Sequence, residues 1–306
     1  IVRWGATFGE IANELQERNV VRSADQLKFT AELYKKTLKL RVGKVTLKQG
    51  MSNYDALFAL IEGPQTFIKF TLPDGYDSKR FARIIERHLE IDSARVVDLV
   101  TDSSFIADLG LQTPSLEGYL YPETYSLTYG LNAKNVVSTL VTQFKKMVHD
   151  SLRIRAQEIG WTLNEILTLA SIIEGEAMVD TEMPLISSVY HNRLDIGMPL
   201  QADPTIQYII PDGPRRLLYR DLEIDSPYNT YKYKGLPPGP INNPGIRAIK
   251  AALYPADTDY LYFVANGDGT HSFSENYSQH LRAKRRFDEY RKKVEEEKRQ
   301  KERDES

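Results

Sequence analysis

The feature that most constrains this chain is an apolar helical stretch near its middle that ends in two acidic residues. Apolar side chains recur at i, i+3, i+4 and i+7 between Thr162 and Met178, which is the pattern of a helix face packed on a core. Thr162 and Glu165 have the spacing of a capping box, which predicts where the helix begins. A helix this apolar has to be buried in a folded domain, so Glu174 and Glu176 are expected at the edge of a core.

The two acids are separated by Gly175. Successive helical residues turn by about 100°, so Glu174 and Glu176 point about 200° apart and cannot serve one site from a regular helix. Both flank apolar neighbours, where desolvation raises the pKa of a carboxyl group and favours a general acid. Geometry does not choose between them, and surface charges at a helix end are the alternative for both. Glycine inside a helix costs about 1 kcal/mol relative to alanine, which indicates that another segment or a substrate comes close at Gly175.

A long stretch rich in proline, glycine, asparagine and tyrosine runs from residue 198 to residue 245. Neutral donors and acceptors on a proline-stiffened backbone suit sugar hydroxyls and acetamides, and rigid loops lose little entropy on binding. A purely structural loop region is the alternative for individual residues. From this stretch and the helix before it, we predict that the substrate is contacted by Asn192, Arg193, Gln201, Asp203, Tyr228, Asn229, Thr230 and Tyr231.

Two further points concern ionisable residues. Arg193 and Asp203 are equally well explained as a structural ion pair. His271 follows a strand-like segment at residues 260–264 and is a candidate wall of the site, although a lone histidine is often an ordinary loop residue. Cysteine is absent and the five histidines lack ligand spacing, so we predict no metal, no cofactor, no disulfide and no thiol catalysis.

The first half of the chain has the texture of a small α+β fold. Apolar residues at helical spacing follow turn or cap residues at Thr7, Ser52 and Asp74, and residues 44–48 and 66–72 alternate as half-buried strands do. Glycan binding by the first of these regions is one interpretation, and a plain α+β domain is the other. We predict an α+β chain with a small module at residues 1–64, a second α+β region at 65–155 and a mixed helix and sheet catalytic domain at 156–306.

Charge and hydropathy narrow the class of partner. A formal net charge of -2 over 306 residues gives no reason to expect nucleic acid. No run of about 18 apolar residues is present, so the sequence itself contains no predicted membrane span. Because it starts at Ile1 rather than Met, we expect a signal or anchor segment ahead of it. From about residue 274 a charged helix is predicted, and the alternating signs from Arg282 to Glu305 are explained by solvent-exposed salt bridges.

Several motifs along the chain resemble those of the MltG/YceG-like endolytic transglycosylases and occur in the same order as in that family. The resemblance covers nearly the whole chain, and several ordered motifs of four to ten residues make it specific. The motifs are LPDGY at 72–76, LEGYLYPETY at 116–125, LASIIEGEA at 169–177, YHNRL at 190–194, MPLQADPT at 198–205, YNTY at 228–231, GLPPGPI at 235–241 and YLYFVA at 260–265.

The resemblance implies a LysM-like N-terminal portion and a C-terminal catalytic domain with a lysozyme-like catalytic helix. It implies that the catalytic acid is the second glutamate of the Glu-x-Glu pair, Glu176. It also implies one N-terminal helix in the inner membrane, with these domains in the periplasm, and penicillin-binding glycan polymerases as protein partners. Gly175 departs from the pattern, because the resemblance leads us to expect a lysine there.

The implied substrate is the peptidoglycan glycan strand, cut between N-acetylmuramic acid and N-acetylglucosamine to leave 1,6-anhydromuramyl ends and to terminate nascent strands. One carboxyl group can act as both acid and base in this reaction. Ordinary hydrolysis uses two, so a hydrolytic muramidase would need a second carboxylate, for which Asp203 is the candidate. A non-catalytic peptidoglycan-binding or scaffold protein is a further candidate. A wall peptidase is less well supported, because the sequence lacks cysteine, a metal set and a G-x-S-x-G elbow.

Overall fold

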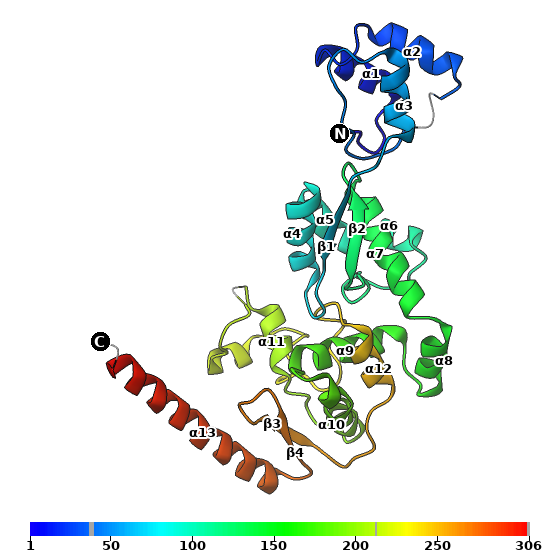
Figure 1. Cartoon of the computed structure of the whole chain (residues 1–306). Coiled ribbons are helices and arrows are strands. Elements are labelled where there is room, and N and C mark those ends of the chain that lie inside the picture. The colour runs from blue at the N-terminus through cyan, green and yellow to red at the C-terminus, as the bar shows by residue number, and fades with distance from the viewer. Residues whose placement is uncertain (37–39, 212, 305–306) are drawn as a thin grey trace. The chain divides into compact units, whose positions relative to one another are not determined.

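The computed structural model describes residues 1–36, 40–211 and 213–304, and it is mixed helix and sheet, as the α+β prediction requires (Figure 1). The predicted boundaries after residues 64 and 155 stay predictions. Within these described ranges, none of the helices combines the length and the apolar character that a bilayer crossing needs. The chain forms two compact units, an N-terminal one of Ile1–Pro73, Ser78–Pro114 and Pro122–Thr142, and a C-terminal one of Asp74–Asp77, Ser115–Tyr121 and Gln143–Ser306.

The first 61 residues of the N-terminal unit have a hydrophobic core of their own. The helix predicted after Thr7 is present, and a capping box between Thr7 and Glu10 starts it. The helix predicted after Ser52 is also present, with the Ser52 side chain accepting from a backbone N–H of the first turn. Three helices enclose this core: α1 (Phe8–Glu17), α2 (Ala24–Leu33) and α3 (Asn53–Glu62).

The strand predicted at residues 44–48 is wrong. In the described part of this module, the backbone pairing nearest to it is an isolated bridge between Val2 and Gly43. Val45 and Leu47 alternate with polar residues because they pack against the helical core, not because a neighbouring strand pairs with them. Alternation reports which side chains are buried, and a ladder additionally requires a partner strand.

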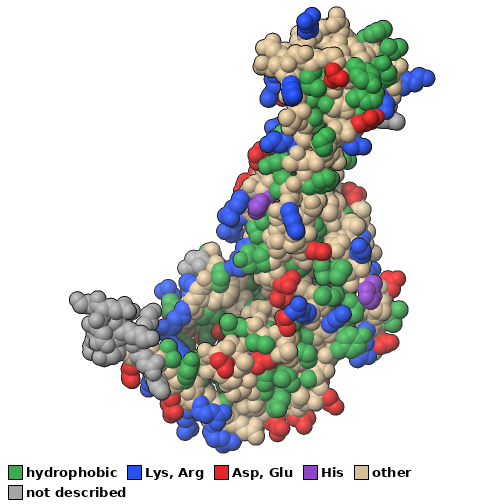
Figure 2. Space-filling model, in the orientation of Figure 1, with side chains coloured by type: hydrophobic (Ala, Val, Ile, Leu, Met, Phe, Trp, Pro, Cys, Tyr) green, Lys and Arg blue, Asp and Glu red, His purple; other side chains and the backbone are tan. Residues whose placement is uncertain are grey.

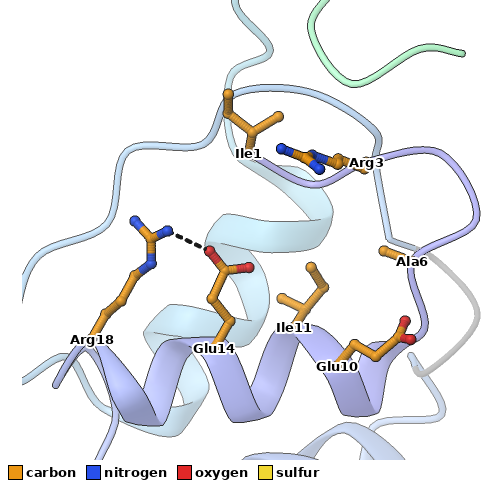
Figure 3. A pocket seen from close by; sticks show the side chains of 7 residues that line it. All are labelled: Ile1, Arg3, Ala6, Glu10, Ile11, Glu14 and Arg18. Atoms are coloured by element: carbon orange, nitrogen blue, oxygen red, sulfur yellow. Dashed lines mark ion pairs between the residues drawn. The ribbon is translucent and has the colours of Figure 1, made fainter.

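Two surface features mark this module. Hydrophobic side chains gather over α2 and α3 in Figure 2, where Phe29 and Leu33 are 66% and 68% exposed. A separate cavity of about 460 Å³ lies beside α1, and Glu14 and Arg18 in its wall form an ion pair at 2.8 Å (Figure 3). Both partners of this pair are solvent-exposed, so it adds at most about 1 kcal/mol to stability. The cavity contains none of the predicted site residues.

The rest of the N-terminal unit is built on a two-stranded antiparallel sheet. The strand predicted at residues 66–72 is confirmed, and Phe70 is buried between the sheet and α4. The helix predicted after Asp74 is confirmed as α4. The elements are β1 (Phe67–Thr71), α4 (Ser78–Leu89), α5 (Ser93–Thr101), α6 (Ser103–Asp108), β2 (Thr124–Thr128) and, up to Thr142, the helix α7 (Ala133–Met147).

The C-terminal unit is organised around the helix predicted from the apolar stripe, α9 (Leu163–Glu176). The capping box of Thr162 and Glu165 is present at its start, and every residue from 166 to 173 is buried. Four other helices surround α9, which explains why it is apolar on all faces. These are α8 (Asp150–Glu158), α10 (Met183–Asp195), α11 (Asp203–Ile209) and α12 (Ile246–Leu253).

Among the remaining elements of this unit, the strand at residues 260–264 and the charged helix were predicted, whereas His271 was expected in a loop and lies in a second strand. Strand β3 (Tyr262–Ala265) pairs antiparallel with β4 (His271–Ser274), and the charged helix α13 (Tyr277–Asp304) ends the described chain. The last part of the predicted charged run, Glu305, lies outside the described residues. The stretch from 198 to 245 is less loop-like than predicted, because it contains α11 and a short 3-10 helix at Tyr219–Glu223. A second short 3-10 helix, Asp180–Glu182, comes directly before α10.

A buried asparagine explains why two short segments from the first half of the sequence belong to the C-terminal unit. The Asn243 side-chain oxygen accepts from the backbone N–H groups of Gly118 and Leu120, at 2.9 and 3.1 Å. Its amide nitrogen donates to the carbonyl of Tyr76 and to a carboxylate oxygen of Glu117. With no exposed surface and all these bonds made, Asn243 fastens both segments to the loop that precedes α12.

Candidate active site

Glu176 is the last residue of α9, and its side chain lies in a cleft. Its Oε1 accepts a hydrogen bond of 2.9 Å from the hydroxyl of Tyr190, a buried residue of α10. The helix ends here because Ala177 takes an extended backbone conformation while its N–H still bonds to the carbonyl of Ile173. The carboxyl group therefore sits at the carboxyl end of a helix, where the helix dipole disfavours a negative charge.

The surroundings of Glu176 raise its pKa to about 7. Burial is the largest cause, since it penalises the carboxylate, and the nearby charge of Asp203 acts in the same direction. The Tyr190 hydrogen bond and the positive charge of Arg193 oppose these effects by favouring the carboxylate. At neutral pH both the acid and its conjugate base are therefore well populated, which suits a group that must first give and then take a proton.

The cleft around Glu176 has a volume of about 260 Å³. It is formed by the ends of α9 and α11, one side of α10, a residue of the YNTY motif and the two strands β3 and β4. Six predicted site residues meet here, together with five residues that were not predicted. The lining consists of Glu176, Tyr190, Arg193, Leu200, Gln201, Asp203, Tyr231, Phe263, Val264, Ala265 and His271.

Asp203 and Tyr231 form a hydrogen-bonded pair in this cleft. The Tyr231 hydroxyl donates to Oδ1 of Asp203 at 2.5 Å, and Asp203 is exposed at the start of α11. Gly175 allows α11 to approach, because a Cβ at this position would lie 2.7 Å from Cβ of Pro204. The prediction that another segment comes close at Gly175 is thus confirmed, and this packing leaves no room for the lysine that the resemblance led us to expect.

Arg193 lines the cleft, but the alternative of an ion pair with Asp203 is wrong. Its guanidinium donates to the backbone carbonyls of Leu261 and Leu200, at 2.7 and 2.6 Å. It is 7% exposed. Arginine is suited to this position because its planar group offers several donors in fixed directions. Arg193 thus joins α10 to the two segments on either side of the cleft, and leaves a positive charge near Glu176.

Asn229 and Thr230 do not line the cleft, and their side chains bond to other groups of the protein. The Asn229 amide donates to the carbonyls of Leu222 and Ile224, and its oxygen accepts from two backbone N–H groups. The Thr230 hydroxyl accepts from the N–H of Ala202. Both side chains are buried, so the structure uses them to shape the loop that carries Tyr231.

Asn192 and Tyr228 are likewise absent from the cleft wall. Asn192 donates both amide hydrogens to the carbonyls of Thr258 and Tyr260. The Tyr228 ring lies 5.0 Å from that of Tyr208, centroid to centroid. The residues that the sequence pattern singled out do make contacts, but with other groups of the protein.

Glu174 has a separate environment, as the helical spacing predicted. Its Oε2 accepts from the backbone N–H of Gly245, at 3.0 Å, immediately before α12. Burial is the main cause that raises the pKa of Glu174, and the charge of Asp74 adds to it. Glu174 does not line the cleft, so of the two acids Glu176 alone has the position of a catalytic group.

The five lining residues that were not predicted are Tyr190, Leu200 and the apolar wall formed by Phe263, Val264 and Ala265. All five lie inside motifs that were recognised, at residues 190–194, 198–205 and 260–265. Their apolar spacing is typical of core residues, and only the position of Glu176 shows that they face a cleft. Across the described part of the chain, acidic and histidine side chains do not gather in groups of three that could hold a metal ion.

Comparisons with known proteins identify the family of this chain. A family model described as the YceG-like family matches residues 1–286, which is most of the chain. The chain belongs to the YceG-like family. A crystal structure of a YceG-like protein from Listeria monocytogenes superimposes with a TM-score of 0.64 and 32% sequence identity, and the match covers 92% of this chain and 96% of that one.

Curated relatives of this YceG-like chain carry one name, endolytic murein transglycosylase. The relative from Bacillus subtilis is 32% identical over 300 residues, which cover 92% of this chain and 82% of that protein. The relative from Streptococcus pneumoniae serotype 2 is 29% identical over 311 residues, or 91% of this chain. The match covers 56% of the pneumococcal protein, so this chain spans little more than half of that relative's length.

Proposed function

We propose that this YceG-like chain is an endolytic peptidoglycan transglycosylase whose catalytic acid is Glu176. The observation that carries the proposal is one carboxyl group, with a pKa of about 7, that faces a cleft of about 260 Å³ at the end of a buried helix. The names of its relatives support the same reaction. The substrate is the glycan strand, cut between N-acetylmuramic acid and N-acetylglucosamine.

The reaction needs one group that works twice. Protonated Glu176 donates its proton to the glycosidic oxygen while the bond from that oxygen to C1 of the muramyl sugar breaks. The muramyl acetamide stabilises the positive charge that develops at C1. The C6 hydroxyl of the same sugar then attacks C1 and gives its proton to the Glu176 carboxylate. The acid is restored, no water is consumed, and the product is a 1,6-anhydromuramyl end.

Neighbouring residues tune and orient the acid. Tyr190 directs Oε1 of Glu176 through its hydrogen bond, and Arg193 supports the carboxylate state that forms after the first proton transfer. The polar groups of Gln201, Asp203 and Tyr231 lie in the same cleft and are available to sugar hydroxyls and acetamides. Phe263, Val264 and Ala265 of β3 give the cleft an apolar side, and an apolar surface there favours attack by the C6 hydroxyl over attack by water.

The N-terminal module is proposed to be LysM-like and to hold the same glycan strands. Its independent core supports a separate binding unit. We further propose that the protein is tethered to the inner membrane by an N-terminal helix, with this region in the periplasm, and that it acts beside penicillin-binding glycan polymerases to terminate new strands. The membrane tether, the periplasmic location and the partnership with glycan polymerases are supported by family resemblance.

A hydrolytic muramidase is the second candidate, because Asp203 lines the same cleft as Glu176. Hydrolysis of a glycoside with two carboxyl groups requires the second one to activate water or to attack C1. The hydrogen bond from the Tyr231 hydroxyl favours instead an orienting role for Asp203. The products distinguish the two reactions, since hydrolysis leaves a reducing end that is one water heavier than the anhydro end.

The test is to digest purified sacculi with the wild type, Glu176→Gln and the matched control Glu174→Gln, and to analyse the products by mass spectrometry. We expect anhydro ends from the wild type and from Glu174→Gln, and none from Glu176→Gln. Reducing ends would establish a muramidase. Loss of activity only in Glu174→Gln would show that Glu174, not Glu176, is the catalytic acid. A wild type that yields no products would favour a peptidoglycan-binding protein.

A further inference from the structure

His271 in the cleft wall is held by a carboxylate that the sequence analysis did not single out. Nδ1 of His271 lies 2.8 Å from Oε2 of Glu182, the residue that precedes α10. The other carboxylate oxygen, Oε1, accepts from the backbone N–H of His271 at 3.0 Å. One glutamate therefore holds both the main chain and the ring of His271, across 89 residues of sequence.

The position of the ring is also restrained by packing. Its centroid lies 5.4 Å from that of Phe263, edge to face, and Phe273 lies on another side at 6.4 Å. The side chains of His271 and Glu182 are 9% and 13% exposed. A ring with this little freedom presents its remaining surface in one direction only, and that surface belongs to the cleft of Glu176.

The bond to Glu182 engages Nδ1 of His271, so Nε2 is the ring nitrogen left for a ligand in the cleft. A carboxylate is an acceptor, so Nδ1 carries the hydrogen in this bond. When the ring is neutral, Nε2 is then unprotonated, and no described residue bonds to that atom. Fixing one ring nitrogen so that the other has a defined state is how proteins orient functional histidines.

We propose that Glu182 is a positioning residue and that Nε2 of His271 accepts a hydrogen bond from a hydroxyl or an acetamide N–H of an amino sugar in the cleft. The inference rests on the proposed function for the class of ligand, a β-1,4-linked amino sugar strand. It adds a contact on the β3–β4 wall of the cleft, formed by a pair of residues outside the acid and its immediate neighbours. Glu182 acts only through His271.

Two substitutions at His271 separate this role from a structural one. In His271→Asn, the amide N–H stays near the position of Nδ1 and can still reach Glu182, whereas nothing replaces Nε2. A structural pair would tolerate this change. A sugar contact would be lost, and one neutral hydrogen bond corresponds to about a tenfold weaker affinity for the strand. His149→Gln is the matched control, because His149 is exposed and its ring bonds only to Ser151 among the described residues.

Binding is measured in the Glu176→Gln background, with isothermal titration of purified uncrosslinked glycan strands. We expect the added His271→Asn change to weaken binding about tenfold and His149→Gln to leave it unchanged. Equal affinity with and without His271→Asn, in variants that melt at the same temperature, would overturn the inference. Strands that fail to bind the parent Glu176→Gln protein would count against it as well.

Glu182→Gln tests the positioning step by a spectroscopic signature. The glutamine amide can donate to Nδ1, which would move the ring hydrogen to Nε2 and turn the acceptor into a donor. We expect the ¹⁵N spectrum of His271, assigned with His271→Asn, to show this change of tautomer along with weaker strand binding. A tautomer that is unchanged, or affinity that is unchanged after the tautomer has switched, would contradict the role of Glu182.

The experiment distinguishes failure of the inference from failure of the proposed function. Wild-type digests of sacculi decide the reaction, independently of binding. Anhydro ends together with unaltered binding in His271→Asn would leave the function standing and remove the contact. Binding that depends on His271 without any cleavage would keep the contact and remove the reaction.

Discussion

The two glutamates at the end of α9 are two residues apart and have different environments. Glu176 meets a tyrosine hydroxyl and an open cleft, whereas Glu174 meets the backbone N–H of Gly245 and lies outside the cleft. Burial raises the pKa of both carboxyl groups. A raised pKa therefore does not distinguish the two carboxyl groups, and access to a cleft does.

The largest expected effect is the loss of activity in Glu176→Gln. If this loss is not observed, the contrast between Glu176 and Glu174 does not hold. Glu176→Gln removes the proton donor and keeps the shape, so turnover should fall by about 10²–10⁴-fold, the range for a general acid. Glu174→Gln should stay within about threefold of the wild type, because its N–H partner can bond to an amide oxygen. The rate of release of soluble muropeptides from sacculi measures both. Equal losses in the two variants would show that the acids work as a unit.

The next effect concerns the packing between the two acids. Gly175→Ala places a Cβ against the ring of Pro204, at 2.7 Å, and should lower the free energy of unfolding by about 1–3 kcal/mol, as overpacking does. An alanine in an open helix would instead raise stability by up to about 1 kcal/mol. Urea denaturation gives the sign. A stabilised variant would mean that α11 moves away easily, and that Gly175 is not what brings Asp203 to the cleft.

Tyr190→Phe removes the hydroxyl that bonds to Glu176 and not to Glu174, and so tests the difference between the two acids. The Tyr190 hydrogen bond lowers the pKa of Glu176, so its loss should raise that pKa above about 7. Catalysis needs the protonated acid, and the alkaline limb of the pH–rate profile should move to higher pH. The plateau rate should fall by up to about tenfold as the acid loses its orientation. An alkaline limb at the wild-type position would show that another group controls it.

The smallest effect is on the pH dependence of stability. A carboxyl group whose pKa is raised on folding binds its proton more tightly in the native state, so its stabilising contribution is complete below the unfolded value, near 4.5, and is lost as pH rises through the folded one. For Glu176 the window is about pH 4.5 to 7. The wild type should therefore lose more stability across this window than Glu176→Gln does. Glu174→Gln should likewise lose less stability than the wild type. Melting temperatures between pH 4 and 8 measure the difference, and parallel curves would contradict it.

The sequence was most informative where neighbours in the chain determine structure. The capping boxes at Thr7 and Thr162 and the apolar stripe of α9 are interactions within one or two turns, and the cap positions and the stripe were predicted correctly. The alternation at residues 44–48 failed because burial against helices produces the same pattern as a strand. Asn192, Asn229 and Thr230 were predicted as sugar contacts because their type suits sugars, but buried carbonyls and N–H groups need the same donors and acceptors.

By itself, the sequence determined the start of α9 and the divergence of its two acids, because helical geometry depends only on spacing along the chain. The tertiary structure alone decided which acid faces the cleft and that Arg193 bonds to carbonyls instead of Asp203. It also decided that Glu182 holds His271. These contacts join segments that only packing brings together, and no local pattern records how loops and helices distant in the chain will meet.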